Sequence, residues 1–390
     1  MPSSTTSCRE ASIPTLPTEL WSMILHFFLG SSIGVHEPCN HFTFPEIILH
    51  LGSPRRYPPI LHKRLGSLRL VCRTFNTLIG SPYFFMKDSS SAIPSSTRAL
   101  FICSRKEVDG CLHRLLTKSP ASHRIVVLDI PGFDRFETHG ILPFYTLCKN
   151  ARSLAAIRSL TIRPGLVSGS RLPSNFWHLL DEAFPQLTFL SLQGPKGEPP
   201  KDKLVTFANL EVLNLDRIEI PSWVQFPSLR HVALTAMPPP WWLSVGSALC
   251  ESLIVQKSDK MPGYEWDLLP RLRLLGVPAS SLSFLPVPPP NHPFCHLCIY
   301  VDTRWRKERA NDPAQHKSQV AWLKLITKRF PNVARFSLEF RLDAHVKNGW
   351  ANGYFSPHDF EPLGFTFKSH FAGKRQGVDR IILERKQVGS

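Results

Sequence analysis

Cysteine and histidine side chains gather most closely in the segment NHPFCHLC. Cys295 and Cys298 have the spacing of a zinc ligand pair, and His292 and His296 lie in the same run. A structural zinc site normally takes a second ligand pair farther along the chain, which this segment lacks. The segment also fits a buried strand, so we interpret both cysteines as reduced core residues rather than metal ligands.

A second group of metal-type residues lies near the N-terminus, at His36, Cys39 and His41. Their spacing is irregular and a clear fourth ligand is missing, whereas structural zinc takes four ligands. We interpret the group as part of an ordinary loop. No metal and no other cofactor is expected.

Two glycine-rich segments resemble catalytic motifs only superficially. GPKG at 194–197 lacks the spacing of a phosphate-binding P-loop, and GLVSG at 165–169 is not a nucleophile elbow. Both are expected to be turns. The spacing of the chain assembles neither a Ser/His/Asp nor a Cys/His group, so we expect a protein that is not an enzyme.

Two further segments have the composition of binding loops. RWRKER carries Arg304, Arg306 and Arg309, which could pair with phosphate or carboxylate groups, although a solvated basic loop is the more common explanation. MPPPWW carries Trp241 and Trp242, a residue type that often anchors partners. The alternative is that the two tryptophans cover an edge of the core.

Composition indicates a folded, loop-rich chain. Its 390 residues are 43% hydrophobic, and 36 prolines require many short connections. The formal net charge of +16 favours acidic partners without choosing among proteins, nucleic acids and membranes. About half of this excess comes from residues 304–390, with 17 Lys/Arg against 8 Asp/Glu.

The sequence also bears on compartment. The first residues lack the basic start and apolar core of a secretory signal, and no apolar run reaches the ~20 residues of a membrane span. Nine scattered cysteines fit reduced thiols. We therefore expect a cytoplasmic or nuclear protein that does not bind membranes.

Two N-terminal segments carry apolar residues at helical spacing. In LPTELWSMILHFFL, Pro17 suits the first helical position, which predicts a helix over 17–29. In LGSLRLVCRTFNTLIG, apolar residues recur from Leu68 to Ile79 with polar residues between them. This pattern predicts an amphipathic helix that ends near Gly80.

The residue pattern of these two segments resembles the F-box motif. The match consists of L-P-x-E-L, then L-x-L-V-C-R-x-F-N-x-L, then a proline and an aromatic pair. The resemblance implies docking on a Skp-family adaptor, and through it on a cullin, in a Skp–cullin–F-box ubiquitin ligase. The implied adaptor contacts are Leu16, Pro17, Leu20, Ile24, Leu25, Leu70, Val71, Cys72, Phe75, Pro82 and Phe85. An insertion at 30–63 makes the connection between the two helices longer than is usual in this family.

From residue 125 onward, three apolar positions spaced x-x and then x recur nine times. The first residues of these triads are Ile125, Ile157, Leu187, Leu210, Leu229, Cys250, Leu272, Phe294 and Val333. Lead-ins such as FPQL, FANL and FPSL precede several of them. Most steps lie in or near the range of about 20 to 29 residues that leucine-rich repeats show, and the pattern resembles that class imperfectly. SNFWHLLDEAF and VAWLKLITKRF are predicted helices, and RIILE a closing strand.

We therefore predict an α/β chain: an F-box-like helical region followed by an irregular leucine-rich-repeat-like solenoid with a curved parallel sheet. The expected divisions are a disordered tail at 1–13, a helical domain at 14–86, a connecting segment at 87–120, and the solenoid with its C-terminal cap at 121–390.

The expected function is non-catalytic substrate recognition for a ubiquitin ligase. The target is a protein, acidic or phosphorylated, chosen by loop residues and by inner-face residues such as Val212, Asn214 and His231. The alternatives are a scaffold that works without a ligase and, less favoured, a basic nucleic-acid-binding protein.

Overall fold

The computed structural model describes residues 83–386, apart from residues 96, 104–106, 119–121, 131–146, 150–153, 163–174, 195–202, 217, 219, 236–247, 257–264, 302–312, 342–357, 359 and 373–377. The predicted tail, both predicted N-terminal helices and the 30–63 insertion lie outside this part. The described part is α/β, with one large and mostly parallel sheet and few helices.

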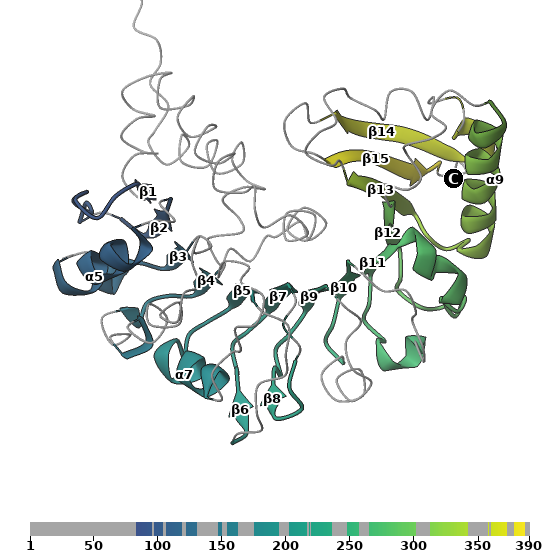
Figure 1. Ribbon diagram of the computed structural model, residues 1–390. Coiled ribbons are helices and arrows are strands. Elements are labelled where there is room, and N and C mark those ends of the chain that lie inside the picture. Colours follow the sequence, from purple (N-terminus) through teal and green to yellow (C-terminus); the bar gives the residue numbers. More distant parts are fainter. Residues whose placement is uncertain are drawn as a thin grey trace, which may run out of the picture.

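The sheet has thirteen strands, which follow one another in chain order except at its C-terminal end. Its parallel strands are β1 (Tyr83–Met86), β2 (Ala99–Ile102), β3 (Val127–Ile130), β4 (Ser159–Ile162), β5 (Phe189–Gln193), β7 (Val212–Asp216), β9 (His231–Leu234), β10 (Ser252–Val255), β11 (Leu274–Pro278), β12 (His296–Val301) and β13 (Arg335–Arg341). Together they form an arc whose inner side is lined by the sheet (Figure 1).

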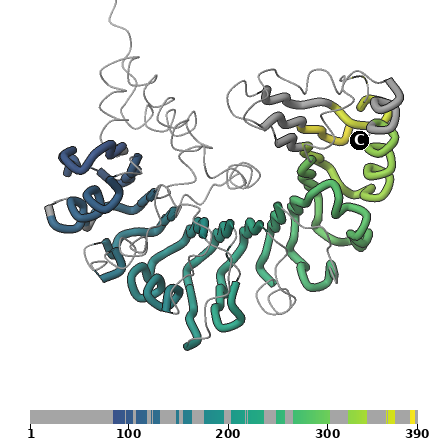
Figure 2. Tube along the Cα trace, viewed as in Figure 1, coloured from purple at the N-terminus to yellow at the C-terminus, as the bar shows by residue number. Residues whose placement is uncertain are grey.

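Helices and short turns lie on the outer side of the arc (Figure 1). They are the helices α5 (Val108–Lys118), α7 (Phe176–Ala183) and α9 (Pro313–Arg329), the 3-10 turns η1 (Ser122–Arg124), η3 (Trp266–Leu268), η4 (Ala279–Phe284) and η7 (Glu361–Leu363), and a two-stranded sheet of β6 (Val205–Thr206) and β8 (Val224–Gln225). The two predicted helices in the body are confirmed as α7 and α9. Figure 2 shows the chain advancing along the arc in sequence order.

One row of apolar side chains runs through the whole sheet in register. The cross-strand partners are Phe84, Leu100, Leu128, Leu160, Leu190, Leu213, Val232, Leu253, Leu275, Leu297, Phe336 and Leu383. From Leu100 on, all of them are buried. They pack in one hydrophobic cluster with the helices on the outer side. All three positions of every predicted triad are buried, so each repeat completes its core against its neighbours.

The recurrent lead-ins form turns directly before the strands. In FPQL, FANL, FPSL, LPRL and FPNV the first residue is buried, and its carbonyl accepts a hydrogen bond from the amide three residues later. Leu187 to Phe184, at 3.1 Å, and Leu272 to Leu269, at 3.0 Å, are examples. The buried first residue fixes the turn to the core, and the turn's hydrogen bond sets where the strand begins.

The sheet starts earlier than the sequence indicates. β1 pairs with β2, and β2 pairs with β3, so within the described residues the sheet extends back to Tyr83 instead of starting at residue 121. Strand β1 lies inside the region assigned to the helical domain. The 87–120 segment is not a separate connector, because it supplies β2 and α5.

The C-terminal end of the sheet is antiparallel. β15 (Val378–Arg385) pairs with β13, and β14 (Phe365–Ala372) pairs with β15. The predicted closing strand RIILE is confirmed as part of β15. Arg335 and Glu384, partners in the β13–β15 register, form an ion pair at 2.7 Å across this junction.

Candidate functional site

The candidate site is the inner face of the sheet, which we define as the side chains that alternate with the core row. Because successive strand residues point to opposite faces, this face consists of the neighbours of each core position. Nearly all the buried polar side chains of the described residues lie on it: Asp129, Ser159, Thr161, Ser191, Gln193, Asn214, His231, Ser252, His296 and Ser337. Only Thr97, Ser122 and Ser281 lie elsewhere.

The N-terminal half of the inner face is polar along its middle. Asp129, Thr161, Ser191 and Asn214 are consecutive cross-strand partners from β3 to β7. The amide Nδ2 of Asn214 donates to Ser191 Oγ at 3.0 Å, within a buried environment. A row of small polar residues can pair sideways in this way because adjacent strands are only about 4.8 Å apart.

A second polar group lies where β5, β7 and β9 end. Gln193 Nε2 donates to Asp216 Oδ2 at 2.7 Å, and Thr235 Oγ1 donates to Asp216 Oδ1 at 2.8 Å. Both oxygens of the Asp216 carboxylate therefore accept a hydrogen bond from a neighbouring strand or its end. Such bonds to a charged acceptor are stronger than those between neutral groups, and they tie the three strand ends together.

The inner face becomes apolar towards the C-terminal half. The row that contains Asn214 continues through Ala233, Ile254, Gly276 and Cys298. A Cβ placed on Gly276 would lie 2.9 Å from Ile254 Cγ1 and 3.3 Å from Tyr300 Cε2. Glycine is therefore required here so that its two neighbours can close over the strand.

His231 lies between Val212 and Ser252 on the inner face and is 7% exposed. Burial, with a further contribution from the nearby Arg230 charge, lowers the pKa of His231 to about 3. The imidazole is consequently neutral at physiological pH. The adjacent Ser252 hydroxyl is fully buried and has no hydrogen-bond partner among the described residues.

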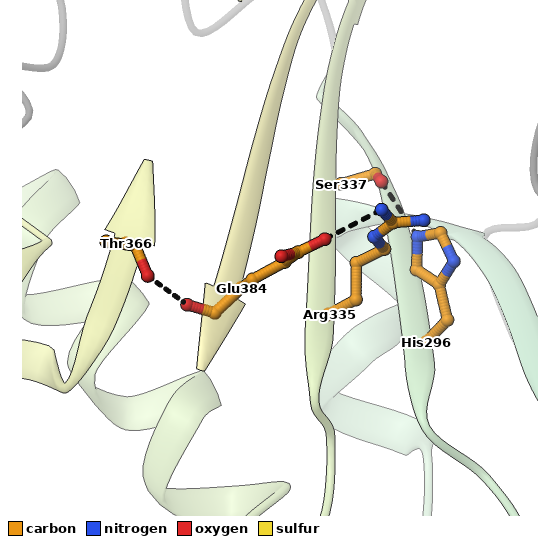
Figure 3. Close-up of polar contacts among 5 residues, drawn as sticks. All are labelled: His296, Arg335, Ser337, Thr366 and Glu384. Carbon is orange, nitrogen blue, oxygen red and sulfur yellow. Dashed lines mark hydrogen bonds and ion pairs between the residues drawn. The ribbon is translucent and has the colours of Figure 1, made fainter. Parts of the chain in front are cut away.

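The structure brings His296 and Ser337 together, which sequence spacing did not reveal. His296 Nε2 and Ser337 Oγ share a hydrogen bond of 2.8 Å between β12 and β13, beside the Arg335–Glu384 ion pair (Figure 3). The Ser337 side chain is completely buried. A nucleophile must reach its substrate, so this arrangement serves as a structural link between strands.

The inner-face residues named as target contacts are buried, which bears on one expectation. Val212, Asn214 and His231 lie on the inner face as predicted, but they are only 5%, 2% and 7% exposed. A target cannot contact them while they are buried. In this arrangement Val212, Asn214 and His231 offer almost no surface for direct target contact.

The two cysteines of the CHLC segment point to different sides of the chain. Cys298 lies on the inner face in register with Gly276 and Ser337. Cys295 precedes β12, where its thiol contacts the Arg273 carbonyl at 3.6 Å. Residues three apart in an extended strand point to opposite faces, so the two thiols cannot chelate one ion.

The two predicted binding loops lie outside the described residues. The segment with Trp241 and Trp242 begins shortly after β9, and the segment with Arg304, Arg306 and Arg309 directly follows β12. Both strands belong to the same parallel run, so both segments leave from the same edge of the sheet. Three strand spacings separate their starting points, or about 14 Å.

Of the implied adaptor contacts, only Phe85 is described. It lies in β1, half-buried, and its ring stacks on Phe101 with centroids 4.9 Å apart. Leu16, Pro17, Leu20, Ile24, Leu25, Leu70, Val71, Cys72, Phe75 and Pro82 lie outside the described residues. The aromatic pair that ends the motif thus belongs to the sheet.

Within the described ranges, no three metal-type side chains gather closely enough to hold an ion. In the same part of the chain, no helix has the length and apolarity to cross a membrane. Comparison with known proteins assigns no family, because no family model matches the chain and no curated protein is significantly similar to it.

Proposed function

We propose that this protein is a non-catalytic substrate-recognition subunit of a Skp–cullin–F-box ubiquitin ligase. The observation that supports this most is the combination of the F-box-like pattern at residues 16–85 with a stack of parallel strands that runs in chain order from β1 to β13. In this stack each strand unit buries its apolar face against its neighbours, as the repeats of an irregular leucine-rich-repeat solenoid do. In such a protein one part is held by the ligase and the other holds a target.

The adaptor would bind the apolar faces of the segments at 17–29 and 68–79. Leu20 and Ile24, four residues apart, would share one face of the first helix. Affinity in this mode of recognition comes mainly from a few apolar anchors that enter pockets of the partner. The Skp-family adaptor would then connect the chain to a cullin.

The target would bind the loops at the carboxyl edge of the sheet, because the inner face is buried. Trp241 and Trp242 would supply aromatic anchors, and Arg304, Arg306 and Arg309 would pair with carboxylates or phosphates. The described sheet holds the strands from which both loops start in fixed register. An acidic or phosphorylated protein segment is the target class that fits these side chains.

Capture of a purified Skp-family adaptor tests the adaptor half of the proposal. Leu20→Asp with Ile24→Asp should abolish capture, because charges would replace two apolar anchors. The control is Leu204→Asp, at a side chain that is 63% exposed in the body and should not affect capture. Circular dichroism should show the same folded body in both variants. Capture that survives the double substitution would remove the basis for the adaptor role.

Two further measurements separate the alternatives. A ligase-independent scaffold would hold its target without any adaptor in the complex. A nucleic-acid-binding protein would shift DNA or RNA with a steep dependence on salt. For the target loops, Arg304→Ala, Arg306→Ala and Arg309→Ala together should weaken binding to phosphopeptides, and unchanged phosphopeptide binding would exclude that role.

A further inference from the structure

The connector between β11 and β12 contains an uncharged proline-rich segment, LPVPPP, at 285–290. Leu285, Val287, Pro288 and Pro289 each precede a proline, which drives the backbone towards extended or polyproline II conformations. Leu285 has φ −71° and ψ 128°, close to the polyproline II values of about −75° and +145°. The chain therefore leaves η4 in a polyproline II conformation at Leu285, and a turn closed by the hydrogen bond from the His292 amide to the Pro289 carbonyl, at 3.0 Å, ends the segment at Pro290.

Burial along this segment repeats every three residues. Leu285 and Pro288 are buried, whereas the pairs 286–287 and 289–290 are exposed. A polyproline II helix has three residues per turn, so it has three edges. One edge packs against the body of the protein and the other two face solvent.

Side chains from other elements hold the backbone of the segment. Trp266 Nε1 donates to the Pro286 carbonyl at 3.0 Å, and Asn332 Nδ2 donates to the Pro290 carbonyl at 3.1 Å. The Arg329 guanidinium on α9 donates to the Leu285 carbonyl. Because polyproline II has no internal hydrogen bonds, these external donors fix a shape that a free peptide would only sample.

Exposed apolar side chains concentrate around the segment. The large hydrophobic residues exposed in the described part are Leu204, Phe284, Val287 and Leu325. Phe284 and Val287 flank the start of the segment. Leu325 lies on α9 one turn before Arg329, which also donates to the Ser283 carbonyl. Phe284, Val287 and Leu325 therefore lie on η4, the proline-rich segment and α9. The Arg329 side chain connects these three elements through its hydrogen bonds to the Ser283 and Leu285 carbonyls.

Charge around the segment is asymmetric. Residues 279–301 contain no Lys, Arg, Asp or Glu, and on the α9 side the last turns carry Lys324, Lys328 and Arg329 without an acidic residue. On the η3 side, beside Trp266, Asp267 is exposed. A partner with carboxylates at one rim of its binding groove would therefore orient that rim towards α9.

We propose that the two exposed edges of residues 285–290 form a docking site for a protein module that binds polyproline II. Such a module, of the SH3 or WW type, presents a groove lined with aromatic side chains. Its rings would pack on Pro286, Val287, Pro289 and Pro290. Because the segment is already held in the bound shape, docking would cost little conformational entropy.

This site is separate from the adaptor and target surfaces of the proposed function. It lies in a connector rather than in the N-terminal segments or in the loops after β9 and β12. Loss of adaptor capture would leave it intact, and loss of the docking site would leave adaptor capture intact. The two proposals can therefore fail independently.

The test uses the full-length protein and a panel of isolated SH3 and WW domains that covers both orientations of proline-rich ligands. Binding is measured by the change in tryptophan fluorescence of each module. At least one module should bind. Pro286→Ala with Pro289→Ala should weaken that binding at least about tenfold, since two proline rings would leave their pockets.

Three further variants sharpen the test. Val287→Lys should also abolish binding, at an exposed position that does not need proline. Lys328→Glu should weaken binding by reversing the charge near the rim, whereas the exposed Leu204→Ala should have no effect. If no module binds the unmodified chain, or if the double proline variant binds as well as the unmodified chain, the docking site does not exist.

Discussion

Asn214 Nδ2 donates a hydrogen bond to Ser191 Oγ at 3.0 Å, from β7 to β5, and both side chains are buried on the inner face. This contact joins two consecutive repeats that are otherwise linked through the core row and the backbone ladder. A buried polar group that loses its partner costs more than the bond itself contributes. The pair is therefore a sensitive probe of how tightly neighbouring repeats are coupled.

Asn214→Ala and Ser191→Ala should each lower the free energy of unfolding by about 1–3 kcal/mol, because each leaves the other partner with one hydrogen bond fewer in a buried site. The double variant should lose less than the sum of the two single losses. Urea unfolding of all four proteins measures the coupling. Strictly additive losses would mean that the two side chains do not depend on each other.

Leu213→Ala should create a cavity in the middle of the core row, where Leu213 lies between Leu190 and Val232 and is fully buried. Large-to-small changes of this kind typically cost about 2–5 kcal/mol. Leu204→Ala is the matched control, because the Leu204 side chain is 63% exposed and its truncation should change stability by less than about 0.5 kcal/mol. Thermal and urea unfolding measure both. Equal losses in the two variants would contradict the assigned row.

Much of the sheet could be predicted because the same three positions face the core in every repeat. The triad pattern missed strands β1 and β2, and the residues at their first triad positions explain why. In β2 the first triad position is occupied by Thr97, which is polar. Thr97 is nevertheless buried, and its amide donates a hydrogen bond to the Pro94 carbonyl in the same kind of turn that precedes the apolar triads. In β1 the corresponding position is Ser81. A search for apolar triads passes over repeats whose first position is polar.

The inner face could not be predicted in the same way. Whether His296 meets Ser337, or Gln193 meets Asp216, depends on residues 41 and 23 positions apart, and so on the exact register between strands. In the N-terminal half of the sheet, polar residues alternate with the core row, and such alternation normally indicates a solvent-exposed face, so the burial of this half could not be predicted.

His231 should make the protein less stable in mild acid. Burial, and secondarily the Arg230 charge, lowers the pKa of His231 to about 3 from the usual 6.5. Between these values the unfolded chain binds a proton that the folded chain does not. The stability that depends on the neutral imidazole is therefore complete above pH 6.5 and is lost as pH falls, by up to about 1.4 kcal/mol per pH unit.

Urea unfolding at pH 7, 6 and 5 tests this effect. His231→Gln removes the titrating group, so its stability should fall less between pH 7 and 5 than that of the unmodified chain. His113→Gln, at an exposed histidine of α5, should keep the unmodified slope. Parallel slopes for the unmodified chain and His231→Gln would show that the imidazole is not held neutral by the fold.

Gly276→Ala should destabilise the inner face through overcrowding. The new Cβ would lie 2.9 Å from Ile254 Cγ1, a distance so short that the Ile254 side chain or its strand must shift. Overpacking of this kind costs about 1–3 kcal/mol, which outweighs the smaller gain from restricting the unfolded chain. Ile254→Ala removes the clashing atom, so the double variant should be more stable than the sum of the two single losses predicts. The exposed Leu204→Ala, combined with Gly276→Ala, should give simple additivity. If Gly276→Ala were neutral, the close approach of β10, β11 and β12 on this face would be looser than the structure gives.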